Sequence, residues 1–106
     1  MTMMTYNDLV NEFRADPREV STAPINGSAP KWFSVYEQQN EVYVASGRDH
    51  RDACSVHPDR RLKPSEFPVM LELYHRRKKG EPVSQEAGRK SINQSYWFGI
   101  FKELSV

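Results

Sequence analysis

Two histidines and the only cysteine of this 106-residue chain lie close enough in sequence to suggest chemistry. His50, Cys54 and His57 are spaced H-x3-C-x2-H, and imidazole and thiolate groups are common zinc ligands. Cys54 with a histidine is also the one pairing able to supply a nucleophile and its base. However, the spacing matches no common structural zinc pattern, and no motif supplies an oxyanion donor. We therefore expect no metal, no cofactor and no catalytic residue, and an enzyme using Cys54 ranks last among the functions we consider.

A run of four cations lies just before Gly80 and indicates a surface for anions. Lys and Arg side chains displace counterions from a nucleic-acid backbone, so such a run is typical of phosphate contacts. A structural explanation competes with this one, because the dipole of a helix favours positive charge in its last turn. With a second basic pair further along the chain, the candidates for phosphate contacts are Arg76, Arg77, Lys78, Lys79, Arg89 and Lys90.

The charge of the chain is divided unevenly between its two halves. Residues 1–47 contain three cations and six anions, which gives −3, whereas residues 48–106 contain twelve cations and eight anions, which gives +4. The sum, +1, is the formal net charge of the chain at pH 7. Such asymmetry indicates an anionic partner and supports the phosphate interpretation of the C-terminal cations.

Residues 84–101 also fit a helix-turn-helix, the motif that places its second helix in the major groove of DNA. Ala87 would take the small position of the first helix, and Ile92 the apolar position of the turn. Glu86 and Lys90 depart from the pattern, since both fall where the motif favours apolar residues. The alternative is an ordinary helical hairpin with its aromatic residues in the core. In the motif, Gln94, Ser95 and Phe98 would face the major groove, and the nearest base-reading candidates are Asn93, Gln94 and Ser95.

The clearest structural element is a β-hairpin over residues 31–46. β-branched and aromatic residues fill the runs on both sides of Gln39-Asn40. A two-residue turn there would set Tyr36 opposite Tyr43. One face then carries Phe33, Val35, Val42 and Val44, and the other carries Trp32, Tyr36 and Tyr43.

The second aromatic face of this hairpin supports a different function. Tyr and Trp are enriched at the energetic centres of protein interfaces, and such rings can also stack on unpaired bases. Packing in the core is the structural alternative. We therefore keep Trp32, Tyr36 and Tyr43 as contact residues of an alternative function, a protein–protein interaction module that includes the case of a homodimer.

Local patterns before and after the hairpin predict further elements. A capping box at Thr5 and Asp8 predicts a helix that ends near Ala15. Turn-forming residues dominate residues 21–30, which we expect to be a loop. A third strand around Ala53–His57 would widen the sheet.

Helical periodicity dominates the C-terminal half. A helix opened by Ser65 or Glu66 should stop at Gly80. Apolar residues recur with helical spacing over residues 92–104, and we favour a helix there. A strand over residues 95–101 is the main alternative, because its aromatic residues have strong strand propensity.

Composition sets the remaining limits. The chain is 38% hydrophobic, 27% charged and 11% aromatic, which is compatible with one folded domain over residues 1–106. Its start shows no signal-peptide pattern and no apolar run is long enough for a membrane span, so we expect a cytoplasmic protein without a membrane partner. We expect an α+β fold: an N-terminal helix, an antiparallel hairpin and two C-terminal helices packed on the sheet. The leading function is a small nucleic-acid-binding or accessory protein, and the alternative partner is a protein or a second copy of the chain.

Overall fold

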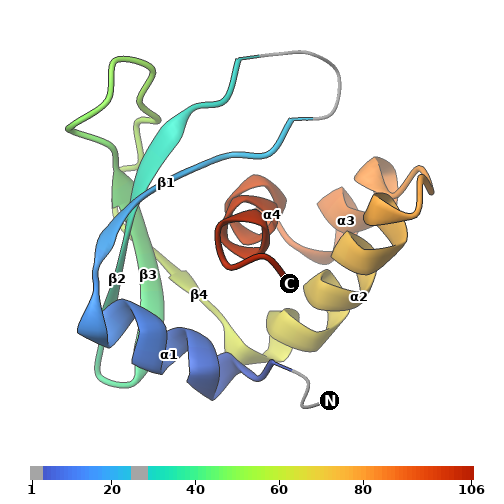
Figure 1. Ribbon diagram of the computed structural model, residues 1–106, viewed down its shortest axis with the longest axis horizontal. Helices are drawn as coiled ribbons and strands as arrows, with labels where there is room; N and C mark the ends of the chain where they lie inside the picture. Colours follow the sequence, from blue (N-terminus) through green and yellow to red (C-terminus); the bar gives the residue numbers. More distant parts are fainter. Residues whose placement is uncertain (1–3, 25–28) are drawn as a thin grey trace.

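The computed structural model describes residues 4–24 and 29–106, and its fold class is α+β, as the sequence predicts (Figure 1). The predicted loop over residues 21–30 lies partly outside the described residues, which exclude 25–28. In chain order the elements are α1 (Tyr6–Ala15), β1 (Arg18–Ser21), β2 (Trp32–Gln38), β3 (Glu41–Ser46), β4 (Arg60–Leu62), the 3-10 helix η1 (Pro64–Glu66), α2 (Phe67–Lys78), α3 (Ser84–Lys90) and α4 (Gln94–Glu103).

Within the described residues the sheet has four strands in the order β1-β2-β3-β4, each antiparallel to its neighbour. The hairpin of β2 and β3 has the predicted register, with Tyr36 paired to Tyr43. Its turn is also the predicted one. Gln39 and Asn40 have φ values of 53° and 64°. This left-handed geometry is typical of two-residue hairpin turns, because its twist matches the twist of the two flanking strands.

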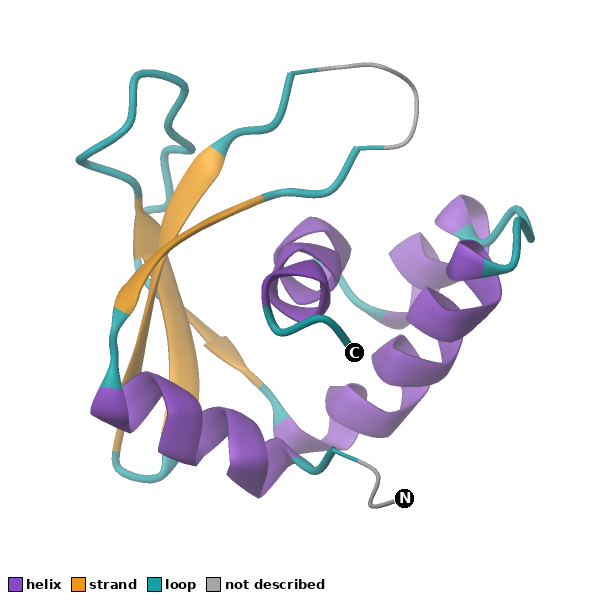
Figure 2. Cartoon of the chain, in the orientation of Figure 1, coloured by secondary structure: helices purple, strands orange, loops and turns teal. Residues whose placement is uncertain are grey.

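One face of the sheet packs against helices. Figure 2 shows α2, α3 and α4 on the same side of the strands. Side chains alternate between the two faces of each strand, so every second residue points toward these helices. The strand residues on this inner face are 0 to 1% exposed and are Val20, Phe33, Val35, Val42, Val44 and Leu62.

α4 lies at the centre of the fold, between the sheet and α2 (Figure 1). Trp97 and Phe101 of this helix are fully buried. A Cβ at Gly99 would lie 2.5 Å from the main-chain oxygen of Ser21 in β1, so glycine permits the close packing of helix on strand. Residues 95–101 thus lie in α4, the helix that we favoured over a strand. The apolar residues of this segment are buried between the sheet and α2.

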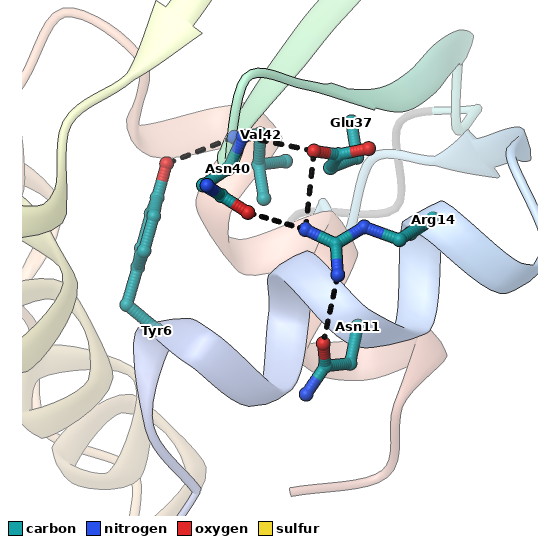
Figure 3. A network of polar contacts seen from close by, with 6 residues as sticks. All are labelled: Tyr6, Asn11, Arg14, Glu37, Asn40 and Val42. Carbon is teal, nitrogen blue, oxygen red and sulfur yellow. Dashed lines mark hydrogen bonds and ion pairs between the residues drawn. The ribbon is translucent and has the colours of Figure 1, made fainter.

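α1 is fixed to the turn of the hairpin by polar contacts (Figure 3). The helix begins with the predicted capping box and ends at the predicted residue. Arg14 donates hydrogen bonds to the side chains of Glu37 and Asn40. The hydroxyl of Tyr6 accepts a hydrogen bond of 2.9 Å from the main-chain N–H of Val42. These contacts close the end of the core beneath the hairpin turn.

The prediction of a third strand around Ala53–His57 is wrong. Only an isolated bridge between Ala53 and Trp32 forms there. The additional strands are β1 and β4, which were not predicted. Each buries a single residue, Val20 or Leu62, so neither shows the alternation of apolar residues by which a strand is recognised.

The two C-terminal helices that we expected are α2 and α4, and the short α3 lies between them. α2 ends just before Gly80, whose φ of 94° is the left-handed conformation in which many helices stop. The path from α2 through α3 brings the first turn of α4 back toward the end of α2, which positions the candidate site.

Candidate anion-binding site

The cations at the end of α2 do not share one environment. Arg76 points toward the loop after α2 and toward α3. Its Nε lies 3.1 Å from a carboxylate oxygen of Glu81, and its Nη1 lies 3.3 Å from one of Glu86. Hydrogen bonds to Glu81 and then Glu86 raise the pKa of Arg76. Because two carboxylates already neutralise this guanidinium, we remove it from the residues expected to contact phosphate.

Arg77, the next residue, points the other way. Its guanidinium carbon lies 5.0 Å from the centre of the Phe98 ring, and its Nη2 donates to the main-chain oxygen of Ala23. Burial lowers the pKa of Arg77, and no carboxylate of the described residues forms an ion pair with it. A half-buried cation without an internal counter-ion carries a desolvation cost that a bound anion would offset.

Arg77 lines a pocket of about 510 Å³, which we call the larger pocket because a second, smaller one adjoins it. The segments after β1 and before β2 and the first turn of α4 form its walls. Lys31 supplies its second cation. Among the residues that the structure describes, no Asp or Glu lines it. Its other side chains include hydroxyl, amide and aromatic groups from Thr22, Ser84, Gln94, Ser95, Tyr96 and Phe98.

A smaller pocket of about 210 Å³ adjoins the larger one, because both are lined by Ala23, Pro24 and Arg77. Lys78 and Lys102 line the smaller pocket, again without a carboxylate among the described lining residues. We call the two adjoining pockets the Arg77 site. Its four cations are Lys31, Arg77, Lys78 and Lys102.

Lys78 is already partly engaged in the smaller pocket. Its Nζ donates a 2.7 Å hydrogen bond to the main-chain oxygen of Val106 and lies 5.6 Å from the centre of the Tyr74 ring. Lys31 and Lys102 are exposed, and neither forms an ion pair within the described part of the chain. These two lysines are therefore the cations of the Arg77 site most open to a ligand.

The helix-turn-helix interpretation fails at α4. Phe98, expected to face a DNA groove, is only 6% exposed, and the apolar turn residue Ile92 is 80% exposed instead of packed. A helix held between a sheet and α2 cannot enter a major groove. Trp97 and Ile100 of the same helix are fully buried. At the surface, α4 presents Ser95 in its first turn and Lys102 and Glu103 at its end.

Asn93 belongs to a buried polar cluster at the turn between α3 and α4. It is 6% exposed, and its Oδ1 accepts a 3.1 Å hydrogen bond from Nη1 of Arg60. Its main-chain N–H donates to the hydroxyl of Ser91, which donates to Glu66 at 3.0 Å. The same Glu66 oxygen accepts a bond from the Trp97 indole at 3.1 Å. Asn93 thus orders the start of α4, and we leave it out of the site.

The structure sorts the predicted residues into three groups. Arg77, Lys78, Gln94 and Ser95 line the Arg77 site. Arg76 and Asn93 have internal partners. Lys79, Arg89 and Lys90 are exposed outside both pockets.

The aromatic residues of the hairpin lie on the outer face of the sheet, opposite the helices. Tyr36 and Tyr43 stack with ring centres 5.5 Å apart, and all of Trp32, Tyr36 and Tyr43 are half-buried. The hydroxyl of Tyr36 donates a 2.7 Å hydrogen bond to Asp59. Burial and Asp59 raise the pKa of Tyr36 to about 12.

His50 and Cys54 of the first motif lie in different surroundings. His50 stacks on Trp32 with ring centres 3.6 Å apart, and its Nδ1 lies 2.8 Å from Glu19. That hydrogen bond to His50 is the main reason why the pKa of Glu19 is lowered. Cys54 instead lines the larger pocket. Within residues 4–24 and 29–106, no three His, Cys, Asp or Glu side chains group as a metal site.

Comparisons of this chain with protein-family models, with curated proteins and with solved structures give no match. No helix in the described part of the chain is long and apolar enough to cross a membrane. The function therefore has to be argued from the geometry of the site itself.

Sequence reasoning missed Lys31 and Lys102 as members of the site. Each stands alone among uncharged or acidic neighbours, so neither shows a local cluster. They join the site because Lys31 precedes β2 and Lys102 lies near the end of α4, next to the end of α2. Only the packing of α4 between the sheet and α2 brings them near Arg77.

Proposed function

We propose that this chain is a non-enzymatic nucleic-acid-binding protein that contacts phosphates through the Arg77 site. The observation that supports the proposal is the gathering of four cations without a carboxylate among the described lining residues. The chain contains 15 Lys and Arg residues against 14 Asp and Glu residues, so an arbitrary patch of its surface is expected to carry both signs. A surface of one sign raises the local concentration of an oppositely charged partner.

Aromatic and amide side chains beside the cations favour single strands over duplexes. Proteins that bind single-stranded nucleic acid combine a cationic path for the backbone with rings on which bases stack. Tyr96 and Gln94 line the same pocket as Lys31 and Arg77. α4 is not free to enter a groove, because its residues Trp97 to Phe101 are buried.

Fluorescence anisotropy with labelled random oligonucleotides, single-stranded and duplex, tests the proposal. Each phosphate contact contributes about −0.7 to the slope of log affinity against log salt for single strands, so the four cations predict a slope near −3. Binding that ignores salt, or no binding at about 100 μM protein, would contradict the proposal. An acidic peptide of equal charge is the control, and equal affinity for it would point to a general polyanion site.

The outer face of the sheet supports a second candidate function, a protein–protein interaction module. The observation that supports it is the set of half-buried rings of Trp32, Tyr36 and Tyr43, which alternate along the strands with the core residues and so lie on the opposite face of the sheet. Light scattering over a range of protein concentrations tests the homodimer form. A mass that rises with concentration in the parent protein, but not in Tyr43→Ala, would favour it. A constant monomer mass would exclude it.

A further inference from the structure

We infer that the larger pocket holds one unstacked nucleotide of a single strand, an inference that rests on the proposed function. Its volume of about 510 Å³ lies within the 300 to 1,000 Å³ that is usual for small-molecule sites. A nucleotide inside a duplex cannot enter such a pocket without leaving the stack, which costs free energy that a single strand does not have to supply. The pocket would therefore give single strands an advantage that phosphate contacts alone do not give.

The side chains that line the larger pocket match the parts of a nucleotide. Lys31 and Arg77 provide positive charge for a phosphate, and the first turn of α4 adds the partial positive charge of a helix start. The carboxamide of Gln94 offers both donors and an acceptor, as the edge of a base requires. Ser95 adds a hydroxyl that can donate or accept.

Tyr96 gives the pocket a ring whose position is fixed by its neighbours. The ring centre lies 4.9 Å from that of Phe33, which is fully buried, in an edge-on arrangement. The guanidinium carbon of Arg60 lies 5.9 Å from the same ring centre. A ring held in this way loses little conformational freedom when a base packs against it. Stacking on aromatic side chains is the usual way in which proteins hold the bases of single strands.

Cys54 makes the occupancy of the pocket measurable, because it lines the larger pocket and is the only cysteine of the chain. Burial raises the pKa of its thiol, so alkylation should be followed at one fixed alkaline pH. We expect a nucleoside monophosphate, at about ten times its Kd, to slow alkylation about tenfold, because the free fraction falls in that proportion. Inorganic phosphate alone should protect the thiol much less, since it leaves the base region of the pocket empty.

A pocket-filling variant and a matched control sharpen the test. Ser95→Trp places a large ring in the larger pocket, whereas Gln85→Trp places the same ring on a residue of α3 that is also exposed but does not line it. We expect Ser95→Trp to remove both the protection of Cys54 and the preference for single strands. Gln85→Trp should retain both. Circular dichroism of the two variants shows whether each has kept its fold, and the alkylation of the parent protein decides the inference independently of them.

The outcomes separate this inference from the proposed function. Salt-dependent oligonucleotide binding without protection of Cys54 would overturn the nucleotide pocket and leave nucleic-acid binding in place. Duplex affinity equal to single-strand affinity would also overturn it. Protection of Cys54 by a mononucleotide, without binding of any oligonucleotide, would support the pocket and contradict the proposed function. Absence of both protection and binding would overturn the two together.

Discussion

The Arg77 site and the outer face of the sheet both gather side chains that can bind a partner, but they differ in how their charges are balanced. On the outer face, Arg61 pairs with Glu41 at 2.8 Å, and His50 pairs with Glu19. In the Arg77 site, no Asp or Glu side chain of the described residues lines either pocket. Arg61 and Glu19 of the outer face thus have side-chain partners within the chain, whereas no Asp or Glu lines the described part of the Arg77 site.

This difference teaches that a cluster of cations in a sequence is not yet a binding surface. The run before Gly80 is contiguous in sequence, yet Arg76 is neutralised by α3 and its loop while Arg77 packs on Phe98. Exposed ion pairs contribute little to stability, and an unpaired, half-buried cation is costly without a partner. An unpaired, half-buried cation such as Arg77 is therefore a better indication of a binding site than an ion-paired one such as Arg76.

The largest expected effect separates the two regions by stability. Phe98 is 6% exposed and forms the wall under Arg77, so Phe98→Ala should destabilise the protein by about 3 to 5 kcal/mol. Tyr43 is half-buried on the outer face, where a cross-strand ring pair contributes about 1 kcal/mol or less. Urea unfolding of Phe98→Ala and Tyr43→Ala measures both. Equal losses of stability in the two variants would contradict a core position for Phe98, the residue on which Arg77 packs.

The next effect separates the regions by affinity for nucleic acid. Lys31 and Lys102 are exposed cations of the Arg77 site, so reversing both to Glu should weaken single-strand binding about 100-fold at low salt, roughly tenfold for each contact.

The double reversal of Arg51 and Lys63 to Glu is the matched control. It changes the net charge equally at exposed residues outside both pockets. Anisotropy titrations should give a loss of only a few-fold for this control. Similar losses in the two double variants would mean that net charge alone, and not the Arg77 site, drives binding.

Much of the fold could be predicted from local patterns, because those patterns describe contacts between sequence neighbours. The capping box at Thr5, the turn at Gln39-Asn40 and the stop at Gly80 all depend on adjacent backbone geometry, and all are confirmed. The strands β1 and β4 were missed because each is defined by its pairing partner and not by its own sequence.

The candidate site was only half predictable for the same reason. Four of the nine predicted residues line it, and these are Arg77, Lys78, Gln94 and Ser95. The sequence could not separate Arg76 from Arg77, because the carboxylates that neutralise Arg76 come from the next loop and from α3. It could not add Lys31 or Lys102 either, since these meet only through tertiary packing.

A smaller effect distinguishes these two neighbouring arginines. Arg77→Gln removes one unpaired cation and should weaken single-strand binding about tenfold, while its amide can still donate to the carbonyl of Ala23. Arg76→Gln should leave affinity within about twofold and cost at most about 1 kcal/mol, because its two ion pairs are largely exposed. Parallel titrations and urea unfolding of both variants provide the data. A larger affinity loss for Arg76→Gln would reverse the assignment of the two residues.

The smallest effect is expected on the outer face, in the pH dependence of stability. The folded state raises the pKa of Tyr36 from 10.0 to about 12 through burial and the hydrogen bond to Asp59. A folded-state pKa above the unfolded value means that the folded protein holds this proton more tightly. The resulting stabilisation is fully present below pH 10 and is lost as the pH rises toward about 12.

Tyr36→Phe tests this contribution because it removes the titrating hydroxyl and keeps the ring that stacks on Tyr43. Urea unfolding between pH 9 and about 12 should show a steeper loss of stability in the parent protein than in Tyr36→Phe. Parallel slopes in the two proteins would contradict a stabilising hydrogen bond between the Tyr36 hydroxyl and Asp59. Oligonucleotide affinity of Tyr36→Phe at neutral pH should equal that of the parent protein, since the outer face is not the proposed binding surface. A loss of affinity there would transfer the interface from the Arg77 site to the aromatic face of the sheet.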